Sequence, residues 1–207
     1  VCSDSNNRTI LAESGGNRIT LFDANGSKLF SFGFFGEGNG QFNTPWDVAV
    51  DNSDNIYVAD SGNSLIQCFN SDGIFQNQTG SFGTDPGQFN LPKGIFIDQP
   101  TGKIYVADTG NHRIQRLNSN LEVDTTWGNN GVVGSTAVVK RDHTGFDRPM
   151  DVAVNPLTGD VYVADYGNCR IEVFNSNGVY QKTYLAVYRP NSLAFDSEGN
   201  LYIAGED

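Results

Sequence analysis

Hydrophobic residues occur in short blocks along the chain, and none of the blocks has the spacing of an amphipathic helix. The blocks are rich in β-branched and aromatic side chains and are bounded by Gly, Asn, Asp or Pro, which is typical of β-strands. Some blocks contain consecutive apolar residues, as in Val48–Val50 and Tyr57–Ala59. Strands of that kind are covered on both faces. The pattern predicts an all-β protein in which sheets pack face to face.

The blocks recur in a fixed order. A Tyr-Val-Ala-Asp block is preceded by a block that begins with proline and is followed by an Ile-x-x-Phe block, a turn and a fourth apolar stretch. Measured on the alanine of the second block, the copies stand at Ala12, Ala59, Ala107, Ala164 and Ala204, with steps of 47, 48, 57 and 40 residues. Four antiparallel strands in each unit, repeated around an axis, predict a β-propeller.

The repeated residues carry a family resemblance. The composite unit G-x-F-x-x-P-x-(D/G)-(V/I)-A-V-D…I-Y-V-A-D-x-G-N-x-R-I-x-x-F resembles the NHL repeat, and the letters Asn-His-Arg-Ile stand at Asn111–Ile114. The resemblance covers nearly the whole chain. It implies a six-bladed propeller of a kind that mostly binds partners and in a minority of cases is an enzyme.

The steps between copies predict one domain, 1–207, with blades at approximately 1–43 (partial), 44–90, 91–147, 148–188 and 189–207 (partial). The first matching block, Thr9–Glu13, is a second strand, so we expect the chain to open there. A six-bladed ring needs roughly 280 residues, which predicts an incomplete ring that lacks about 1.5 blades. Either further residues of a longer protein or another chain would cover the apolar ends. The second case allows head-to-tail self-association.

Composition narrows the function classes. The chain of 207 residues has 24 acidic and 13 basic side chains, a net charge of −11, which opposes nucleic-acid binding because a phosphate backbone requires a continuous basic face. No apolar stretch approaches the roughly 20 residues of a membrane span. The cysteines at Cys2, Cys68 and Cys169 form no close pair, so they predict neither a zinc knuckle nor a disulfide framework.

An acidic column follows the Tyr-Val-Ala letters, and an arginine stands five residues later in three of the four units. A ring of carboxylates for metal or acid–base chemistry is one interpretation. A repeated charge-assisted hydrogen bond across a hairpin explains both columns, and we favour it. The structural positions are Glu13, Asp60, Asp108, Asp165, Arg18, Arg113 and Arg170.

The start of each first strand lies nearest the propeller axis, so its residues line one mouth of the central channel. These residues are Trp46, Asp47, Lys93, Met150, Asp151 and Asn191. We interpret this mouth as a contact for a protein or peptide partner. Asp47 and Asp151 are alternative ligands for a hard cation such as calcium, the one cofactor that the sequence leaves open. The long step between copies places extra residues between Trp127 and Phe146, where Lys140 and Arg141 form a basic pair on a second candidate contact loop.

A zinc enzyme is disfavoured. The resemblance includes a peptidyl-α-hydroxyglycine α-amidating lyase, which holds zinc through three histidines. This chain has only His112 and His143, and no histidine stands after the strand-opening prolines. Two histidines on different elements do not form a catalytic zinc site, so we predict no catalytic residue.

Three glycosylation sequons begin at Asn7, Asn25 and Asn77, a number that chance alone would give. The sequence therefore predicts a non-enzymatic interaction or structural module of a larger, extracellular protein. Two alternatives stay open. One is a structural subunit of a head-to-tail extracellular assembly or fibril, and the other is a metal-dependent propeller enzyme, either lyase-like or a calcium-dependent hydrolase.

Overall fold

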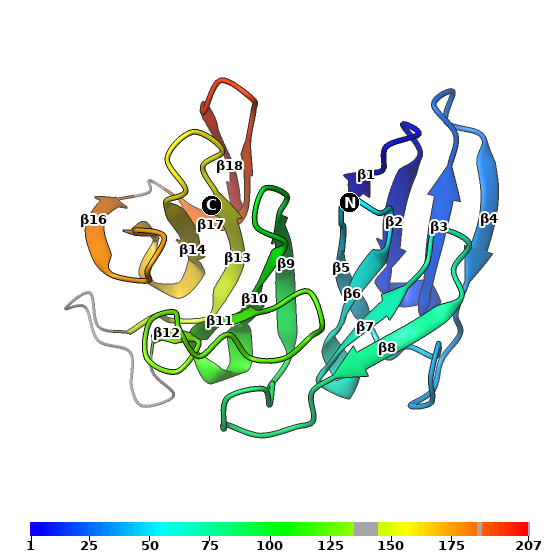
Figure 1. The fold of residues 1–207 in the computed structure, drawn as a ribbon, viewed down its shortest axis with the longest axis horizontal. Coiled ribbons are helices and arrows are strands. Elements are labelled where there is room, and N and C mark those ends of the chain that lie inside the picture. The colour runs from blue at the N-terminus through cyan, green and yellow to red at the C-terminus, as the bar shows by residue number, and fades with distance from the viewer. Residues whose placement is uncertain (135–144, 186–187, 207) are drawn as a thin grey trace.

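The computed structural model describes residues 1–134, 145–185 and 188–206. These residues form four antiparallel sheets of four strands each and one two-stranded sheet (Figure 1). The first sheet holds β1 (Cys2–Ser3), β2 (Thr9–Glu13), β3 (Arg18–Phe22) and β4 (Lys28–Phe32), and the second holds β5 (Pro45–Val50), β6 (Ile56–Asp60), β7 (Leu65–Phe69) and β8 (Phe75–Thr79). The third holds β9 (Pro92–Asp98), β10 (Lys103–Asp108), β11 (Arg113–Leu117) and β12 (Val132–Gly134). The fourth holds β13 (Pro149–Val154), β14 (Val161–Asp165), β15 (Arg170–Phe174) and β16 (Tyr180–Leu185), and the last pairs β17 (Arg189–Phe195) with β18 (Leu201–Glu206).

The first strands of neighbouring sheets contact one another: β1 meets β5, β5 meets β9, β9 meets β13 and β13 meets β17. In Figure 1 the other strands fan outward from these inner strands, so that β4 and β16 lie at opposite outer edges. The described sheets do not close into a ring. The predicted all-β propeller of four-stranded antiparallel blades, arranged as an incomplete ring, is confirmed.

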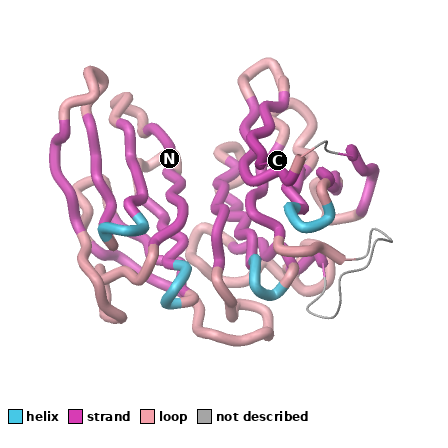
Figure 2. Tube along the Cα trace, turned by 180° about the vertical axis from the view of Figure 1, so that it is seen from behind, coloured by secondary structure: helices cyan, strands magenta, loops and turns pink. Residues whose placement is uncertain are grey.

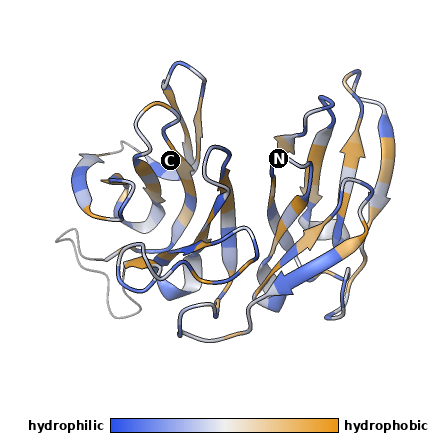
Figure 3. Ribbon diagram, viewed as in Figure 1, coloured by the Kyte–Doolittle hydropathy of each residue, from blue (hydrophilic) through white to orange (hydrophobic). Residues whose placement is uncertain are grey.

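Each hydrophobic cluster lies between two neighbouring sheets. Ile10 and Leu21 of the first sheet pack with Val48 and Phe69 of the second, and three similar clusters follow between the later pairs of sheets. This explains why the inner blocks have consecutive apolar residues, since both faces of a middle blade are covered. Figure 3 shows the outer strand β8 as hydrophilic, because it lies at the rim.

Single-turn 3₁₀ helices join the second and third strands of the four complete sheets (cyan in Figure 2). They are η1 (Ser14–Gly16), η2 (Ser61–Asn63), η3 (Thr109–Asn111) and η4 (Tyr166–Asn168), and the residue after each one is left-handed. None of the helical turns in the described ranges is long and apolar enough to cross a membrane.

Two expectations about strand positions were wrong. The chain does not open at a second strand, because Cys2 and Ser3 pair with Ile10 and Thr9 and form a short first strand. Only two residues pair there, too few to give a hydrophobic pattern. The sequence predicts an outer strand of the third sheet that ends by Trp127, before the inserted residues, whereas the outer strand is β12. Residues 118–131 form a loop that folds back over the sheet, and its Trp127 is completely buried.

Candidate functional site

A β-bulge shapes the start of the inner strand in each of the second to fifth sheets. Pairing shifts directly after Pro45, Pro92, Pro149 and Pro190, so that one residue more stands on the inner strand than on its partner. The bulge is where Trp46, Lys93, Met150 and Asn191 stand. Bulges bend a strand locally and redirect a side chain, and they are frequent beside functional sites. The repeated bulge therefore places these four predicted mouth residues at the same end of the inner strands.

Three of these residues line one cavity of about 260 Å³. Trp46, Lys93 and Met150 share it with Thr109, Arg148, Tyr166 and Glu206. The Trp46 side chain remains 45% exposed. Asn191 lies beside this cavity, because its Nδ2 donates to Glu206 Oε1 at 3.4 Å. The structure therefore gathers the apolar and cationic residues of the predicted mouth in one place, which we call the mouth pocket.

Cations and aromatic rings alternate around the mouth pocket. Lys93 Nζ lies 3.6 Å from the centroid of the Trp46 ring, and Arg148 Cζ lies 5.5 Å from that of Tyr166. Arg189 Cζ lies 5.6 Å from the same Tyr166 ring. Partial burial and the nearby Arg148 charge lower the pKa of Lys93. The pocket presents apolar surface and excess positive charge together.

Asp47 and Asp151 occupy a second layer, one residue further along their strands. Together with Ser192 they line an axial cavity of about 440 Å³ rather than the mouth pocket. Asp47 Oδ2 accepts a hydrogen bond from the backbone N–H of Ile95 at 3.2 Å, and Asp151 Oδ2 accepts one from Leu193 N–H at 2.8 Å. Each carboxylate thus ties its own inner strand to that of the next sheet.

The surroundings of these two carboxylates disfavour charge. Burial raises the pKa of Asp47, and burial together with the Asp47 charge raises the pKa of Asp151 to about 7. The corresponding residue of the third sheet is Gly94, where an added Cβ would lie 2.5 Å from Asp151 Oδ1. Within the described residues, no three His, Cys, Asp or Glu side chains lie together as a metal-binding group would require. The two aspartates serve the packing of neighbouring blades.

The acidic column and the arginine column meet across the hairpins. Arg113 Nε and Arg170 Nε each lie 2.7 Å from the carboxylates of Asp108 and Asp165, and both pairs are buried. The pair of Glu13 and Arg18 has the same 2.7 Å separation but is partly exposed. Asp60 has no arginine opposite and accepts from Gln67 Nε2 at 2.9 Å instead.

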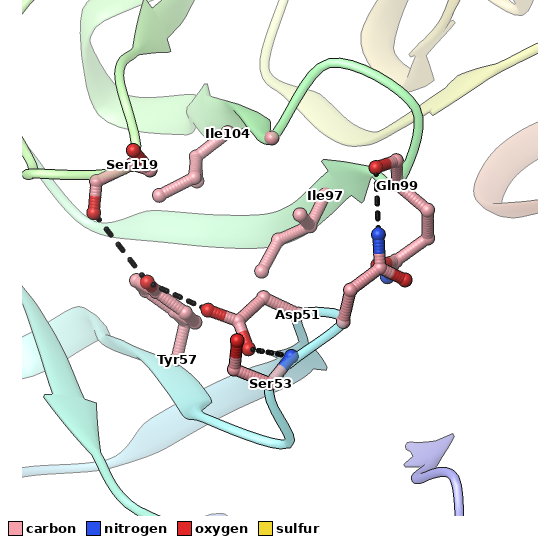
Figure 4. Close-up of a pocket in the computed structure, with 9 residues that line it drawn as sticks. Asp51, Ser53, Tyr57, Ile97, Gln99, Ile104 and Ser119 are labelled. Carbon is pink, nitrogen blue, oxygen red and sulfur yellow. Dashed lines mark hydrogen bonds between the residues drawn. The ribbon is translucent and has the colours of Figure 1, made fainter.

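A smaller cavity of about 140 Å³ lies between the second and third sheets, at the turns between their first two strands (Figure 4). Its polar groups bond within the protein. Asp51 accepts from the backbone N–H of Ser53 at 2.9 Å and from the Tyr57 hydroxyl at 3.2 Å. Asn52 Nδ2 donates to the Gln99 carbonyl at 2.9 Å and so joins the two turns. The cavity therefore lies within the packed contact between two blades, and its polar groups stabilise that contact.

His112 has a structural role at the mouth. His112 Nδ1 accepts a hydrogen bond from the backbone N–H of Arg148 at 3.1 Å, so it helps to hold the strand start beside the mouth pocket. His143, Lys140 and Arg141 lie outside the described residues.

The sequons at Asn7, Asn25 and Asn77 are all exposed. Cys2, Cys68 and Cys169 are free thiols.

Sequence reasoning missed four residues of the mouth: Arg148, Tyr166, Arg189 and Glu206. Tyr166 and Glu206 occupy the position directly after the acidic column, which in other sheets holds Ser14 or Thr109. Those two hydroxyls donate to carbonyls of the next sheet, at Pro45 and Pro149. Large polar side chains at a repeat position that elsewhere holds a small hydroxyl residue could have identified Tyr166 and Glu206 as candidate site residues.

Comparison with known proteins agrees with this geometry. The profile of the NHL repeat matches residues 42–69, 89–117 and 146–174, which run from the buried phenylalanine before the second, third and fourth sheets to the end of their third strands. No curated protein matches the chain significantly by sequence.

Solved structures match over nearly the whole chain at low identity. A streptogramin B lyase matches with a TM-score of 0.69 and 13% identity, covering 99% of this chain and 60% of the lyase. A virginiamycin B lyase from Staphylococcus aureus matches with a TM-score of 0.69 and 10% identity, covering 99% and 61%. A chain of a nidogen/laminin complex matches with a TM-score of 0.74 and 15% identity, covering 98% and 69%.

The chain thus spans about 60% of the length of the two lyases. At these identities the likeness concerns the fold. The chain therefore carries three NHL repeats, each in register with one four-stranded sheet, and folds as a β-propeller.

Proposed function

We propose that this chain is a non-enzymatic propeller module that binds a protein or peptide partner through the mouth pocket. The observation that carries the proposal is Trp46, a large aromatic side chain left 45% exposed on a bulge, beside Met150 and Lys93. Tryptophan and methionine are enriched at protein interfaces, and tryptophan is a frequent binding hot spot. A position that needed only to pack against the next blade would not present this side chain to solvent.

The carboxylates next to the pocket support a binding role over metal-dependent catalysis. Asp47 and Asp151 accept backbone hydrogen bonds from the neighbouring sheets, so each carboxylate has a structural partner, and the described residues place no group of three His, Cys, Asp or Glu side chains there. Calcium sites take six to eight oxygen ligands, commonly several carboxylates and carbonyls.

An extracellular location forms part of the proposal. All three sequons present exposed asparagines, so a glycosylating enzyme would have access to them. The similarity to a chain from a nidogen/laminin complex supports a module that contacts another protein. The similarity to two lyases supports the competing enzymatic function.

The test is a selection of displayed dodecamer peptides on purified protein, followed by affinity measurements on variants. We expect selected peptides to lose at least about tenfold in affinity with Trp46→Ala, since hot-spot truncations cost about 2 kcal/mol or more. Ile74→Ala is the matched control, because Ile74 is also an exposed apolar residue but lies at the turn before β8. Equal losses in both variants would contradict the proposal. So would a stoichiometric bound metal that Asp151→Asn removes.

Self-association is a second candidate function, favoured by β18, which pairs only with β17 among the described strands. Its Tyr202 and Ile203 are 61% and 50% exposed, one on each face of the strand. Exposed apolar surface of this kind favours association with another surface. Light scattering over a range of concentrations tests this role: a mass that stays at one chain, unchanged by Ile203→Asp, would exclude it.

A further inference from the structure

The mouth pocket concentrates positive charge in a protein whose net charge is −11. Lys93, Arg148 and Arg189 surround it, each against an aromatic ring. Arg148 has a carboxylate neighbour, Asp147, at 3.3 Å. Lys93 Nζ has no ion-pair partner among residues 1–134, 145–185 and 188–206; it rests on the Trp46 ring. The Lys93 ammonium group lies on the Trp46 ring and near the positive charge of Arg148, so binding an anion from outside would be electrostatically favourable.

The one carboxylate lining the pocket is already engaged. Glu206 accepts from the Tyr166 hydroxyl at 3.0 Å and from Asn191 Nδ2 at 3.4 Å. The Glu206 charge attracts Lys93, but Glu206 makes its hydrogen bonds to Tyr166 and Asn191, and no ion pair joins it to Lys93 in the described part of the chain. The Lys93 ammonium therefore keeps a position for a carboxylate from outside.

The volume of the mouth pocket limits the size of the group that can bind in it. About 260 Å³ is smaller than the roughly 300 to 1,000 Å³ of typical small-molecule sites, and it suits one or two side chains of a larger partner. The axial cavity below is a separate site, because Asp47 and Asp151 line it and the Val1 ammonium group lies 3.2 Å from Asp47 Oδ1. We therefore place the acidic side chain at Lys93, in the mouth pocket.

Phosphate of a nucleic acid fits less well. Such a ligand requires basic residues along several successive phosphates, whereas the cations here surround a single pocket on an acidic protein. The apolar surfaces of Trp46 and Met150 favour a peptide that carries a hydrophobic residue beside the acidic one.

We propose that the mouth pocket recognises an acidic segment of a protein partner, with a Glu or Asp side chain against Lys93 and a neighbouring apolar side chain on Trp46 and Met150. This inference rests on the proposed function and names the chemistry of its partner. Charged hydrogen bonds contribute more than neutral ones, so Lys93 determines the preference for acidic sequences.

The test uses fluorescein-labelled pentapeptides with blocked termini and fluorescence anisotropy. The acidic probe is Gly-Glu-Leu-Glu-Gly, and its neutral counterpart has Gln in place of Glu. We expect the acidic probe alone to bind, more weakly as salt rises. Lys93→Gln is expected to weaken binding about tenfold or more, and Lys93→Arg to retain most of it. Lys182→Gln is the matched control, because Lys182 also lies over an aromatic ring, 5.0 Å from the Tyr184 centroid, but on the outer strand β16.

Several outcomes would overturn the inference. They are no binding of the acidic probe, equal binding of the neutral probe, and equal losses in the Lys93→Gln and Lys182→Gln variants. Binding only of a neutral peptide with a free C-terminus, or only of a uridine decamer, would also overturn it. If selected peptides depend on Trp46 but not on Lys93, the inference fails and the proposed function stands. If they depend on neither residue, the proposed function fails as well.

Discussion

Asp108 organises three neighbouring segments through one carboxylate. Its Oδ1 accepts from the backbone N–H of Asn90 at 2.7 Å, and its Oδ2 accepts from Arg113 Nε at 2.7 Å and Asn111 Nδ2 at 2.9 Å. Arg113 then donates to the Thr84 carbonyl at 2.6 Å, in the loop that leads into the third sheet. The repeated aspartate thus joins the loop, the hairpin and the third strand of its blade.

Arg113→Ala should lower the free energy of unfolding by about 3 kcal/mol, since it leaves a buried carboxylate without its charged partner. Arg18→Ala is the control, because Arg18 pairs with Glu13 at the same 2.7 Å separation on a partly exposed surface. Exposed pairs contribute little to stability. Urea unfolding measures both, and similar losses in the two variants would show that the buried pair has no special role.

Asp151 should make stability depend on pH. Its pKa is raised to about 7, so between about pH 4, the ordinary value for Asp, and pH 7 the folded protein binds a proton that the unfolded chain releases. This contribution is complete at the acidic end of the window and is lost as the pH rises through 7. Urea midpoints of wild type and Asp151→Asn from pH 5 to 8 should therefore differ in slope, with wild type declining more steeply. Parallel curves would contradict the assignment.

The three thiols should differ in reactivity. Cys68 is buried, and burial raises its pKa to about 11 and that of Cys2 to about 12. Cys169 lies in the turn after η4 and is half-buried. A thiol reagent followed by peptide mass spectrometry should label Cys169 first, because the thiolate is the reactive form. Equal labelling rates for Cys169 and Cys68 would show that the strand β7 opens readily.

The spacing of the acidic and arginine columns was enough to predict their pairing, because both residues belong to one hairpin. The role of Asp47 and Asp151 was harder to predict. Their partners are backbone N–H groups of the next sheet, at Ile95 and Leu193, which no side-chain pattern reveals. Calcium binding was an open alternative for this reason.

At the scale of elements, the third sheet shows where pattern reasoning failed. The segment before Trp127, where the sequence predicts the end of the outer strand, forms a loop. Within it, Asp124 Oδ2 lies 2.8 Å from both Lys103 Nζ and Arg116 Nη2, while the Arg116 guanidinium lies over the Trp127 ring. This polar cluster and two backbone hydrogen bonds of Arg116, whose carbonyl accepts from the Asp124 N–H at 2.9 Å and whose N–H donates to the Gly131 carbonyl at 2.8 Å, hold this segment without a continuous ladder.

A glycine that contacts the phenylalanine of the next repeat marks the end of the outer strand in the second and third sheets. Gly80 has φ +112° and an added Cβ would lie 2.8 Å from the Phe89 ring, so only glycine fits there. Gly134 repeats this arrangement with Phe146, with φ +96° and a Cβ that would lie 2.6 Å from the ring. Matching glycines instead of apolar blocks would have ended the strand at Gly134.

Trp127→Ala should be among the most destabilising single changes, at about 3 to 5 kcal/mol, because it empties a fully buried site between the third and fourth sheets. Phe82→Ala is the control, since Phe82 is an exposed aromatic residue on a connecting loop. Thermal or urea unfolding checks both. A small effect of Trp127→Ala would mean that the loop is not part of the folded core.

At the scale of the whole molecule, the repeat predicted the architecture because each blade obeys the same local rules. The positions of four mouth residues followed from that architecture. Tyr166 begins η4 and Arg189 begins β17, and the two lie beside the mouth only in the folded arrangement, so the repeat could not identify them. What the fold adds is two layers, a cationic and aromatic mouth above an axial cavity with two carboxylates.

The location of the binding face is the central claim, and hydrogen–deuterium exchange with and without a selected peptide tests it most directly. The account predicts added protection at the starts of β5, β9, β13 and β17 and at η3 and η4, with the outer strands β4, β8 and β16 unchanged. The Trp46→Ala variant should show none of this protection. Protection confined to the outer strands, or to the turns around Asn52 and Gln99 at the other end of the inner strands, would contradict the claim that the mouth pocket is the binding site.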